Sequence, residues 1–265
     1  MQPSLNPPPL VMLTPNLAYH PIDWSTLINA FFSESVIHVW YVTLNKQAQS
    51  YYKPFYATLS SEEKIRFEQL KPVYRERVVF TRGLLRSLLA CYMGKQPQDI
   101  CLSYTDTGKP FLQNTGNQPD LEFNLSHSKN KIAFALTLET PVGIDLEHNK
   151  PKRYLDKIAY RFLSASDYKQ LKKVTGEAKL KLFFEAWVQN EALLKARAKT
   201  LKTHPLSQHT IDRLKLMNVT DESLTFYTLT NLTLEDQMVA AIAVRGEKKA
   251  ISVHHCETLA VTTGA

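Results

Sequence analysis

Two short segments constrain the fold of this chain more than any other feature. In the first, residues 142–147, apolar residues alternate with small or acidic ones. Alternation along a strand sends the two sets to opposite faces, which are Val142, Ile144 and Leu146 against Gly143, Asp145 and Glu147. The segment therefore predicts a strand with one buried face and two neighbouring carboxylates on the other.

The second segment, residues 187–195, predicts a helix. It is rich in Ala, Leu, Glu and Lys and free of Gly and Pro. At helical spacing Glu191 lies on the apolar stripe, and Lys195 follows one turn later on the same face. The ordinary alternative is a solvated Glu-to-Lys pair, but the apolar neighbours Phe184, Trp187, Val188 and Leu194 favour a partly buried carboxylate.

The paired acids indicate a cation. Two carboxylates side by side repel each other unless a cation or a shared proton relieves them, and oxygen pairs are preferred ligands of Mg²⁺. A hard divalent metal is therefore the first candidate ligand. Zinc is not expected, because Cys91, Cys101 and Cys256 are far apart, form no C-x-x-C motif, and fit reduced core thiols.

Length and charge narrow the class of protein. With 265 residues, 44% of them hydrophobic, the chain suits one large domain or two smaller ones, and we expect two. No stretch approaches the roughly 18 apolar residues of a membrane span, and the N-terminus has no signal-peptide pattern. We therefore expect a soluble cytoplasmic protein. The net charge of +7 favours a polyanionic partner without naming it.

The order of elements predicts an α+β fold. Residues 1–35 are Pro-rich and predict an extension. Strands are expected near residues 37–44, 100–104, 121–125, 132–138 and 142–147, and again at 223–229, 238–244 and 250–253. The polar residues 126–130 are expected to form a turn between two of these strands. Helices are expected after Ser60 or Ser61, at 73–93, and in three pieces between 152 and 201, with breaks near residues 164–166 and 175–176. We predict two similar α+β subdomains, residues 36–140 and 141–265, in a pseudo-two-fold arrangement with the active site in the cleft between them.

The motifs resemble those of one family. The sequence GIDLE stands at residues 143–147 and FFxxWxxxEAxxKA at residues 183–196, with TGKP at 107–110 and FNLSHS at 123–128 upstream. Together with segments 59–63 and 82–87 they resemble the 4′-phosphopantetheinyl transferase superfamily, Sfp type. The resemblance runs from about residue 37 to residue 201 and is looser beyond.

The resemblance implies a fold, a reaction and partners. Family members of this type are monomers of two α+β halves with coenzyme A bound between them. They move the phosphopantetheine of coenzyme A to a serine of an acyl, polyketide or peptidyl carrier protein and release adenosine 3′,5′-bisphosphate. Carrier proteins are acidic, which suits a basic chain. No nucleic acid or membrane partner is implied.

The resemblance also assigns roles to individual residues. The metal ligands would be Asp145, Glu147 and Glu191, holding Mg²⁺, or alternatively Mn²⁺, against the pyrophosphate. Glu191, with a raised pKa, would accept the serine proton, and Lys195 would neutralise the leaving phosphate. Coenzyme A would be held by Arg77, Lys109, Ser126, His127 and Lys195, whereas Arg86 would be structural.

The chain departs from the family pattern at three positions. Asn190 replaces a lysine, which is expected to remove a positive charge near the phosphates or the carrier; Ala198 and Thr200 replace glycines and are expected to stiffen the next loop. Other hypotheses remain. One is a non-catalytic basic module that binds an acidic carrier protein or nucleic acid, and another is a different Mg²⁺-dependent phosphotransferase or nuclease. The short trimeric holo-acyl-carrier-protein synthases catalyse the same reaction as the family named above, but they are about half as long as this chain.

Overall fold

The computed structural model describes residues 33–44, 51–106, 108–113, 120–198, 227–234 and 237–256. Its helices are α2 (Tyr52–Ala57), α3 (Ser61–Glu68), α4 (Pro72–Met93), α5 (Leu155–Phe162), α6 (Ala165–Leu171) and α7 (Gly176–Ala196), with a 3₁₀ turn at Pro97–Asp99. Its strands are β1 (Val36–Thr43), β2 (Leu102–Tyr104), β3 (Pro110–Leu112), β4 (Leu121–Ser128), β5 (Lys131–Leu138), β6 (Val142–His148), β7 (Tyr227–Thr233), β8 (Met238–Arg245) and β9 (Ala250–Cys256).

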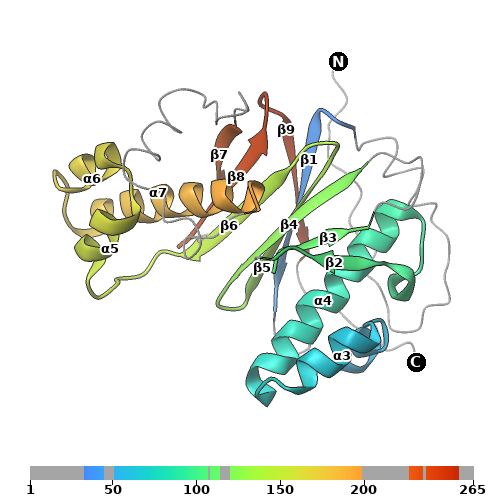
Figure 1. The fold of residues 1–265 in the computed structure, drawn as a ribbon. Helices are drawn as coiled ribbons and strands as arrows, with labels where there is room; N and C mark the ends of the chain where they lie inside the picture. Colours follow the sequence, from blue (N-terminus) through green and yellow to red (C-terminus); the bar gives the residue numbers. More distant parts are fainter. Residues whose placement is uncertain are drawn as a thin grey trace, which may run out of the picture.

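The strands form two main sheets and a small hairpin. The larger sheet has the order β4-β5-β1-β9, the smaller one the order β6-β8-β7, and β2 pairs with β3 alone. All the pairings are antiparallel except that of β1 with β9, which is parallel although the two strands come from opposite ends of the chain. The last described strand therefore belongs to the sheet of the first half (Figure 1).

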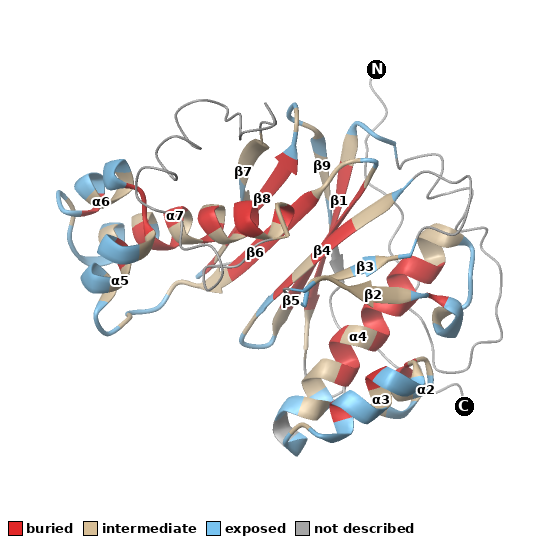
Figure 2. Ribbon diagram, in the orientation of Figure 1, coloured by how far each residue is buried: buried red, intermediate tan, exposed pale blue. Residues whose placement is uncertain are grey.

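Each sheet has one face toward the other sheet and one face toward helices. Between the sheets, apolar residues of β1 and β5 pack against the apolar face of β6 and against β8. On the outer face of the larger sheet, α2 and α4 cover Trp40, Phe123 and Phe134, and on the outer face of the smaller sheet α7 covers Ala241 and Ala243. Figure 2 shows the buried residues concentrated on these strands and on the inner sides of α4 and α7.

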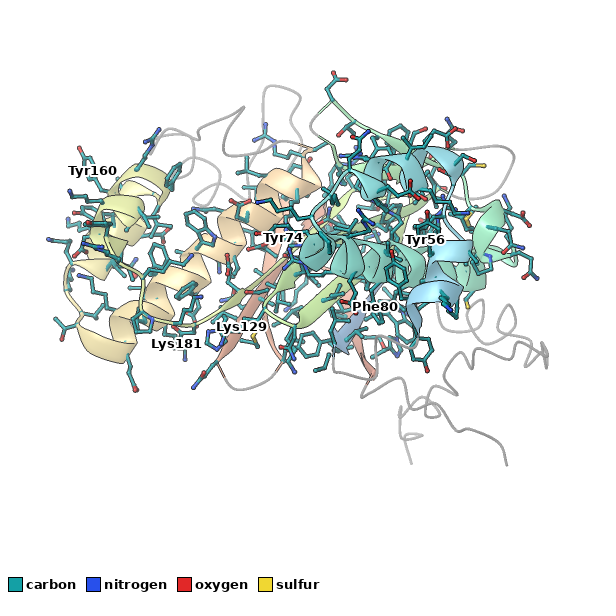
Figure 3. All side chains as sticks on the ribbon, turned by 90° about the horizontal axis from the view of Figure 1, so that it is seen from below. Tyr56, Tyr74, Phe80, Lys129, Tyr160 and Lys181 are labelled. Carbon is teal, nitrogen blue, oxygen red and sulfur yellow. The ribbon has the colours of Figure 1, made fainter. Side chains whose placement is uncertain are left out.

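The remaining helices build a separate end of the molecule. Helices α5 and α6 pack on the first turns of α7 through Leu163, Leu171 and Phe183. Tyr160 and Lys181 mark this end in Figure 3, and Tyr56 and Phe80 mark the opposite end, which α2 and α4 cover. No helix in the described ranges has the length and apolar character needed to cross a membrane.

The predicted fold class is confirmed, and so are most of the elements. The chain is α+β, and β1, β5, β6 and β8 occupy the predicted segments within one or two residues. The three pieces between residues 152 and 201 are α5, α6 and α7, with breaks at the predicted places. The division of the chain near residue 140, the pseudo-two-fold arrangement and the cleft stay predictions. The extension at residues 1–35 lies outside the described residues except for its last three.

Two expectations were wrong in detail. Residues 126–128 were expected to form a turn, but they are the last three residues of β4, and the turn consists of Lys129 and Asn130. Cys101 was expected to be in the core, but it is exposed; Cys91 and Cys101 are both free, as expected. The side chain of Cys256 is not among those described.

The N-terminal cap of α3 explains the motif at residues 59–63. Ser60 and Glu63 form a capping box, in which each side chain bonds the backbone N–H of the other residue. The buried Glu63 carboxylate also accepts from the Arg86 guanidinium at 2.7 Å, and Arg86 donates to the carbonyl of Ile100 at 2.8 Å. Arg86 is 2% exposed, so the expectation that it is structural is confirmed.

Candidate active site

A glycine brings helix α7 into direct contact with strand β6. The apolar residues of β6 point into the core between the sheets, so Gly143, Asp145 and Glu147 point toward α7, as the alternation predicts. A Cβ atom on Gly143 would lie 2.0 Å from the carbonyl oxygen of Ala192 and 2.4 Å from the amide nitrogen of Ala196. Only glycine fits here, and the contact places the last two turns of α7 beside Asp145.

Lys195 and Asp145 form an ion pair at this contact. The Lys195 Nζ donates to Asp145 Oδ1 at 2.7 Å and to the carbonyl oxygen of Ile144 at 3.1 Å. The Asp145 side chain is 9% exposed and the Lys195 side chain 27%. Asp145 Oδ1 also accepts from the hydroxyl of Ser126 at 2.8 Å. One carboxylate oxygen is thus held by two donors from two different elements.

Glu191 lies one turn before Lys195 on α7 and is half-buried. The pKa of Glu191 is raised to about 7, chiefly by burial and then by the charge of Asp145, with a smaller contribution from Glu147; the charges of Lys195 and Lys152 oppose this rise. A carboxyl group with a pKa near neutrality can take up and release a proton at physiological pH.

The acids were predicted to hold a metal ion, and the structure bears on that prediction in two ways. Nowhere in the described ranges do three His, Cys, Asp or Glu side chains gather closely enough to hold one, and the cation beside Asp145 is Lys195. Asp145 Oδ2, however, is buried and has no hydrogen-bond partner among the described residues. An unpaired carboxylate oxygen suits a hard cation. The raised pKa of Glu191 points the same way, because it shows that burial and the neighbouring acids disfavour another negative charge here. The residues therefore fit a divalent metal, and the ligand set stays a prediction.

Side chains cover the outer edge of β6 around these acids. The N–H groups of Ile144, Leu146 and His148 donate to side-chain oxygens of β4. The outward carbonyls of Val142 and Ile144 accept from Lys109 and Lys195, at 3.5 and 3.1 Å. An edge strand with its polar groups satisfied in this way is fixed in place.

Comparison with known proteins identifies the family. Residues 141–253 match the family model described as 4′-phosphopantetheinyl transferase superfamily, and residues 46–138 match the one described as 4′-phosphopantetheinyl transferase, N-terminal. The 4′-phosphopantetheinyl transferase HetI of Nostoc sp. is 34% identical over 214 residues, which are 79% of this chain and 88% of HetI. The chain belongs to the 4′-phosphopantetheinyl transferase superfamily.

Other members of the superfamily match a smaller part of the chain. The 4′-phosphopantetheinyl transferase Sfp of Bacillus subtilis is 30% identical over 156 residues, 54% of this chain and 67% of Sfp. The transferase AcpT of Escherichia coli strain K12 is 31% identical over 112 residues, 42% of this chain and 54% of AcpT. The predicted family is confirmed.

The residues predicted to bind coenzyme A do not all lie together. Ser126 is buried and hydrogen-bonded to Asp145. Lys109 donates to the carbonyl of Lys195 at 3.0 Å, at the C-terminal end of α7, where a cation also interacts favourably with the helix dipole. Burial lowers the pKa of Lys109. The family motifs TGKP and SHS thus contact the two elements that carry the acids.

His127 and Arg77 are not among the residues that contact Asp145 or α7 through a described hydrogen bond. His127 is exposed, and strand alternation sends its side chain to the face of β4 opposite that of Ser126. Arg77 is half-buried on α4, and its Nε is buried without a hydrogen-bond partner among the described residues. In the described part of the chain, no hydrogen bond or ion pair joins either residue to Asp145.

The structure describes two of the three departures from the family pattern, Asn190 and Ala198. Asn190 is 2% exposed, and its Nδ2 donates to the carbonyl of Phe162 at the end of α5, at 3.2 Å. Its side chain therefore ties α7 to the end of α5, and the expected effect of the missing lysine on the phosphates or the carrier stays a prediction. Ala198 has a φ of 53°, a conformation that favours glycine. Thr200 lies outside the described residues.

Sequence reasoning missed Lys152. Its ammonium lies 4.9 Å from the ring centroid of Phe184, 5.2 Å from that of Trp187 and 5.8 Å from that of Phe183, and its charge lowers the pKa of Glu191. Lys152 stands five residues after Glu147 in a run of basic residues, a pattern typical of a solvated surface. The aromatic residues spaced along one face of α7 were the signal for its position.

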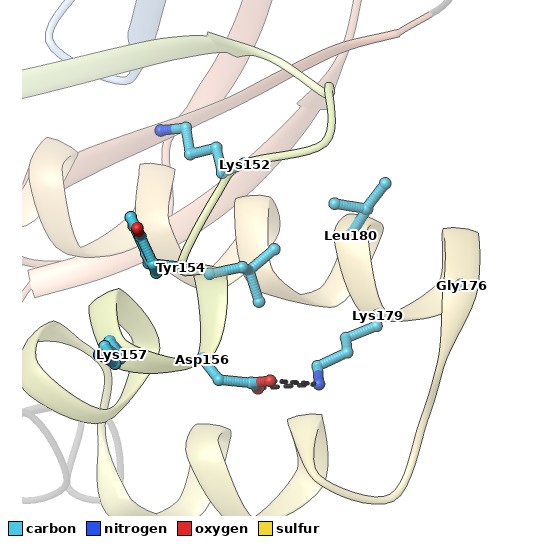
Figure 4. A pocket seen from close by; sticks show the side chains of 8 residues that line it. Lys152, Tyr154, Asp156, Lys157, Gly176, Lys179 and Leu180 are labelled. Atoms are coloured by element: carbon cyan, nitrogen blue, oxygen red, sulfur yellow. Dashed lines mark hydrogen bonds and ion pairs between the residues drawn. The ribbon is translucent and has the colours of Figure 1, made fainter.

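A pocket opens beside this lysine, at the junction of α5 and α7 (Figure 4). It has a volume of about 430 Å³. An ion pair between Lys179 and Asp156, at 2.8 Å, lies in its wall. The lining residues are Lys152, Tyr154, Leu155, Asp156, Lys157, Gly176, Lys179 and Leu180. Cations predominate over acids in this lining.

Proposed function

We propose that this member of the superfamily transfers the 4′-phosphopantetheine group of coenzyme A to a serine of an apo carrier protein. The observation that carries the proposal is the juxtaposition at the end of α7: a half-buried Glu191 with a pKa of about 7 and a Lys195 ammonium 2.7 Å from Asp145. The similarity to HetI, Sfp and AcpT, each named a 4′-phosphopantetheinyl transferase, supports the same reaction.

The proposed step is a phosphoryl transfer in which the residues of α7 manage the proton and the charge. The serine oxygen of the carrier bonds to the phosphorus that bears the pantetheine, and its proton passes to the Glu191 carboxylate directly or through a water. The bond from that phosphorus to the bridging oxygen breaks, and the electron pair leaves with adenosine 3′,5′-bisphosphate. Lys195 neutralises the charge on the leaving phosphate.

We propose Asp145, Glu147 and Glu191 as the ligands of Mg²⁺, with Mn²⁺ as the alternative metal. When bound, the ion supplies Lewis-acid stabilisation of the charge on the pyrophosphate. The unpaired Asp145 Oδ2 supports this assignment. Arg77, Lys109 and His127 are proposed to bind the phosphates and nucleotide of coenzyme A, because arginine, lysine and histidine donors suit phosphate oxygens. Ser126 is proposed to contribute through its bond to Asp145.

The proposed protein substrate is acidic. A net charge of +7 on this chain favours association with a negatively charged carrier domain, and the cation-rich pocket between α5 and α7 adds to this field. We further propose that the transferase acts as a cytoplasmic monomer, which size-exclusion chromatography with light scattering tests.

A carrier-modification assay tests the proposal. Purified protein is incubated with Mg²⁺, coenzyme A and a panel of apo acyl, polyketide and peptidyl carrier proteins, and the intact mass of each carrier is measured. The proposal predicts at least one carrier heavier by one phosphopantetheine group. Unchanged masses across the whole panel would favour the non-catalytic binding module instead, particularly if a carrier binds the protein in a pull-down.

A further inference from the structure

Strand β4 fastens the edge of β6 through side chains spaced two residues apart. The Ile144 N–H donates to Asn124 Oδ1 at 2.9 Å, the Leu146 N–H to Ser126 Oγ at 3.2 Å, and the His148 N–H to Ser128 Oγ at 3.1 Å. Each partner lies 20 residues upstream of the amide that it accepts from. We call this row of three side chains, Asn124, Ser126 and Ser128, the seam. The seam joins β4 and β6 where a continuous sheet would have backbone hydrogen bonds, whereas on its other edge β6 pairs with β8.

The two serines of the seam make a second bond that the asparagine does not make. Ser126 Oγ donates to Asp145 Oδ1 at 2.8 Å, and Ser128 Oγ donates to Glu147 Oε2 at 3.2 Å. Each hydroxyl thus accepts a hydrogen bond from one backbone amide of β6 and donates one to the carboxylate of the residue just before that amide in the strand. Asn124 accepts from the amide of Ile144, and the residue before Ile144 is Gly143, which has no side chain to bond.

We infer that Ser128 is a positioning residue for Glu147, as Ser126 is for Asp145, and that the seam sets the orientation of both carboxylates. A hydroxyl has one proton, and here the backbone amide occupies an acceptor site on the oxygen, which leaves the proton for the carboxylate. The amide is fixed by the sheet, so it fixes the hydroxyl, and the hydroxyl restricts the carboxylate rotamer. The inference rests on the proposed function, since it is the transfer reaction that requires these carboxylates at a metal.

The orientation matters because a hard metal ion requires its oxygen ligands in a defined geometry. Partners that hydrogen-bond metal ligands from behind orient them, and removing such a partner weakens metal binding by roughly 10- to 100-fold. Glu147 is half-buried near the end of its strand, with fewer restraints than Asp145, which is also held by Lys195. Ser128 is therefore the residue whose removal isolates the effect.

The test is a titration of Mn²⁺ in the presence of saturating coenzyme A, in which electron paramagnetic resonance measures the concentration of the free ion. Ser128→Ala is expected to raise the Mn²⁺ dissociation constant about 10-fold. Ser128→Thr keeps the hydroxyl and is expected to bind Mn²⁺ as the wild type does. Should Ser128→Ala not fold, Ser128→Cys supplies a side chain of nearly equal size and a weaker donor, and is also expected to bind Mn²⁺ more weakly.

Asn124→Ala is the matched control, because it removes a bond of the seam that orients no carboxylate. It is expected to lower the melting temperature of the metal-free protein and to leave the Mn²⁺ dissociation constant near that of the wild type. Steady-state kinetics should show the same split: Ser128→Ala raises the metal concentration for half-maximal transfer and keeps kcat at saturating metal.

Two results would overturn the inference. One is a Ser128→Ala variant that folds and binds Mn²⁺ as tightly as the wild type, and the other is an Asn124→Ala variant that weakens binding as much as Ser128→Ala does. The proposed function fails in a different way, namely when the wild type modifies no carrier. The Mn²⁺ titrations decide the role of Ser128 in either case.

Discussion

Lys195 on α7 and Asp145 on β6 are joined by a 2.7 Å ion pair, although they lie 50 residues apart in the sequence. The pair is possible because Gly143, two residues before Asp145, lets the backbone of α7 contact the strand. Helix position and charge pairing are therefore coupled: whatever moves α7 away from β6 also separates the two charges and displaces Glu191.

Substitution of Gly143 should disturb the site and the fold together. The added methyl group of Gly143→Ala would overlap backbone atoms of Ala192 and Ala196, which cannot give way as a flexible side chain can. We expect a loss of about 3 kcal/mol in the free energy of unfolding and little remaining transfer activity. Urea denaturation and the carrier assay measure the two effects.

Gly94→Ala is the matched control for that substitution. A Cβ atom there would meet no atom within 4 Å, and only the positive φ of 61° opposes it. Its expected cost is about 1 kcal/mol, with transfer unaffected. Equal stability losses in the two variants would contradict the close packing of α7 on β6.

Removal of the Lys195 ammonium should leave Asp145 with a buried, unbalanced charge. We expect Lys195→Met to lower kcat by about 100-fold or more and the free energy of unfolding by about 2 kcal/mol, less than for a fully buried pair because Lys195 is 27% exposed. In the double variant Asp145→Asn, Lys195→Met, stability should recover most of this loss while activity does not. Additive stability losses would show that the ion pair is energetically unimportant.

The stability of the metal-free protein should depend on the ionisation of Glu191. Its pKa rises from 4.5 in the unfolded chain to about 7 in the folded protein, so between these values the folded state binds a proton that the unfolded state has lost. The free energy of unfolding should therefore fall as pH rises from about 4.5 to 7. From the shift, the fall is on the order of 2–3 kcal/mol, reduced by solvent screening of a half-buried group.

Glu191→Gln should remove this part of the pH dependence, because glutamine does not titrate. Denaturation of wild type and variant in the presence of EDTA at several pH values measures the difference. Parallel stability curves for the two proteins would mean that Glu191 does not have a raised pKa.

Ala198 carries backbone strain that glycine would relieve. Its φ of 53° lies in the left-handed region, which is unfavourable for alanine by about 1–2 kcal/mol. Ala198→Gly is expected to raise the free energy of unfolding by up to about 1 kcal/mol after the entropy of glycine is subtracted. Ala196→Gly, inside the last turn of α7, should instead destabilise the protein by about 1 kcal/mol or more. A destabilising Ala198→Gly would contradict the assigned conformation.

The sequence was informative where one periodicity dominated. The alternation in β6 predicted which residues face the core, and helical spacing placed Glu191 and Lys195 on one face of α7. Residues 126–128 were harder, because a short polar run ordinarily indicates a turn; here its hydroxyl groups satisfy the edge of another sheet. The parallel pairing of β1 with β9 depends on contacts between opposite ends of the chain, which no local pattern contains.

The family pattern predicted where a residue stands in the sequence better than it predicted what the side chain of that residue contacts. Asn190 stands where the pattern has a lysine, but its burial against the end of α5 follows from which side of α7 it occupies and from the packing of α5 on that side. Lys152 could not be placed from its own segment, since its location depends on aromatic rings about thirty residues further along the chain. Such contacts require the fold.

The most direct test of the central claim is the intact mass of an apo carrier protein after incubation with coenzyme A, Mg²⁺ and either the wild type, Asp145→Ala or Glu191→Ala. We predict that the wild type adds one phosphopantetheine group and that neither variant adds any, although Glu191→Ala keeps the circular dichroism spectrum of the wild type. A carrier that remains unmodified by the wild type, or that is modified equally by all three proteins, would contradict the account.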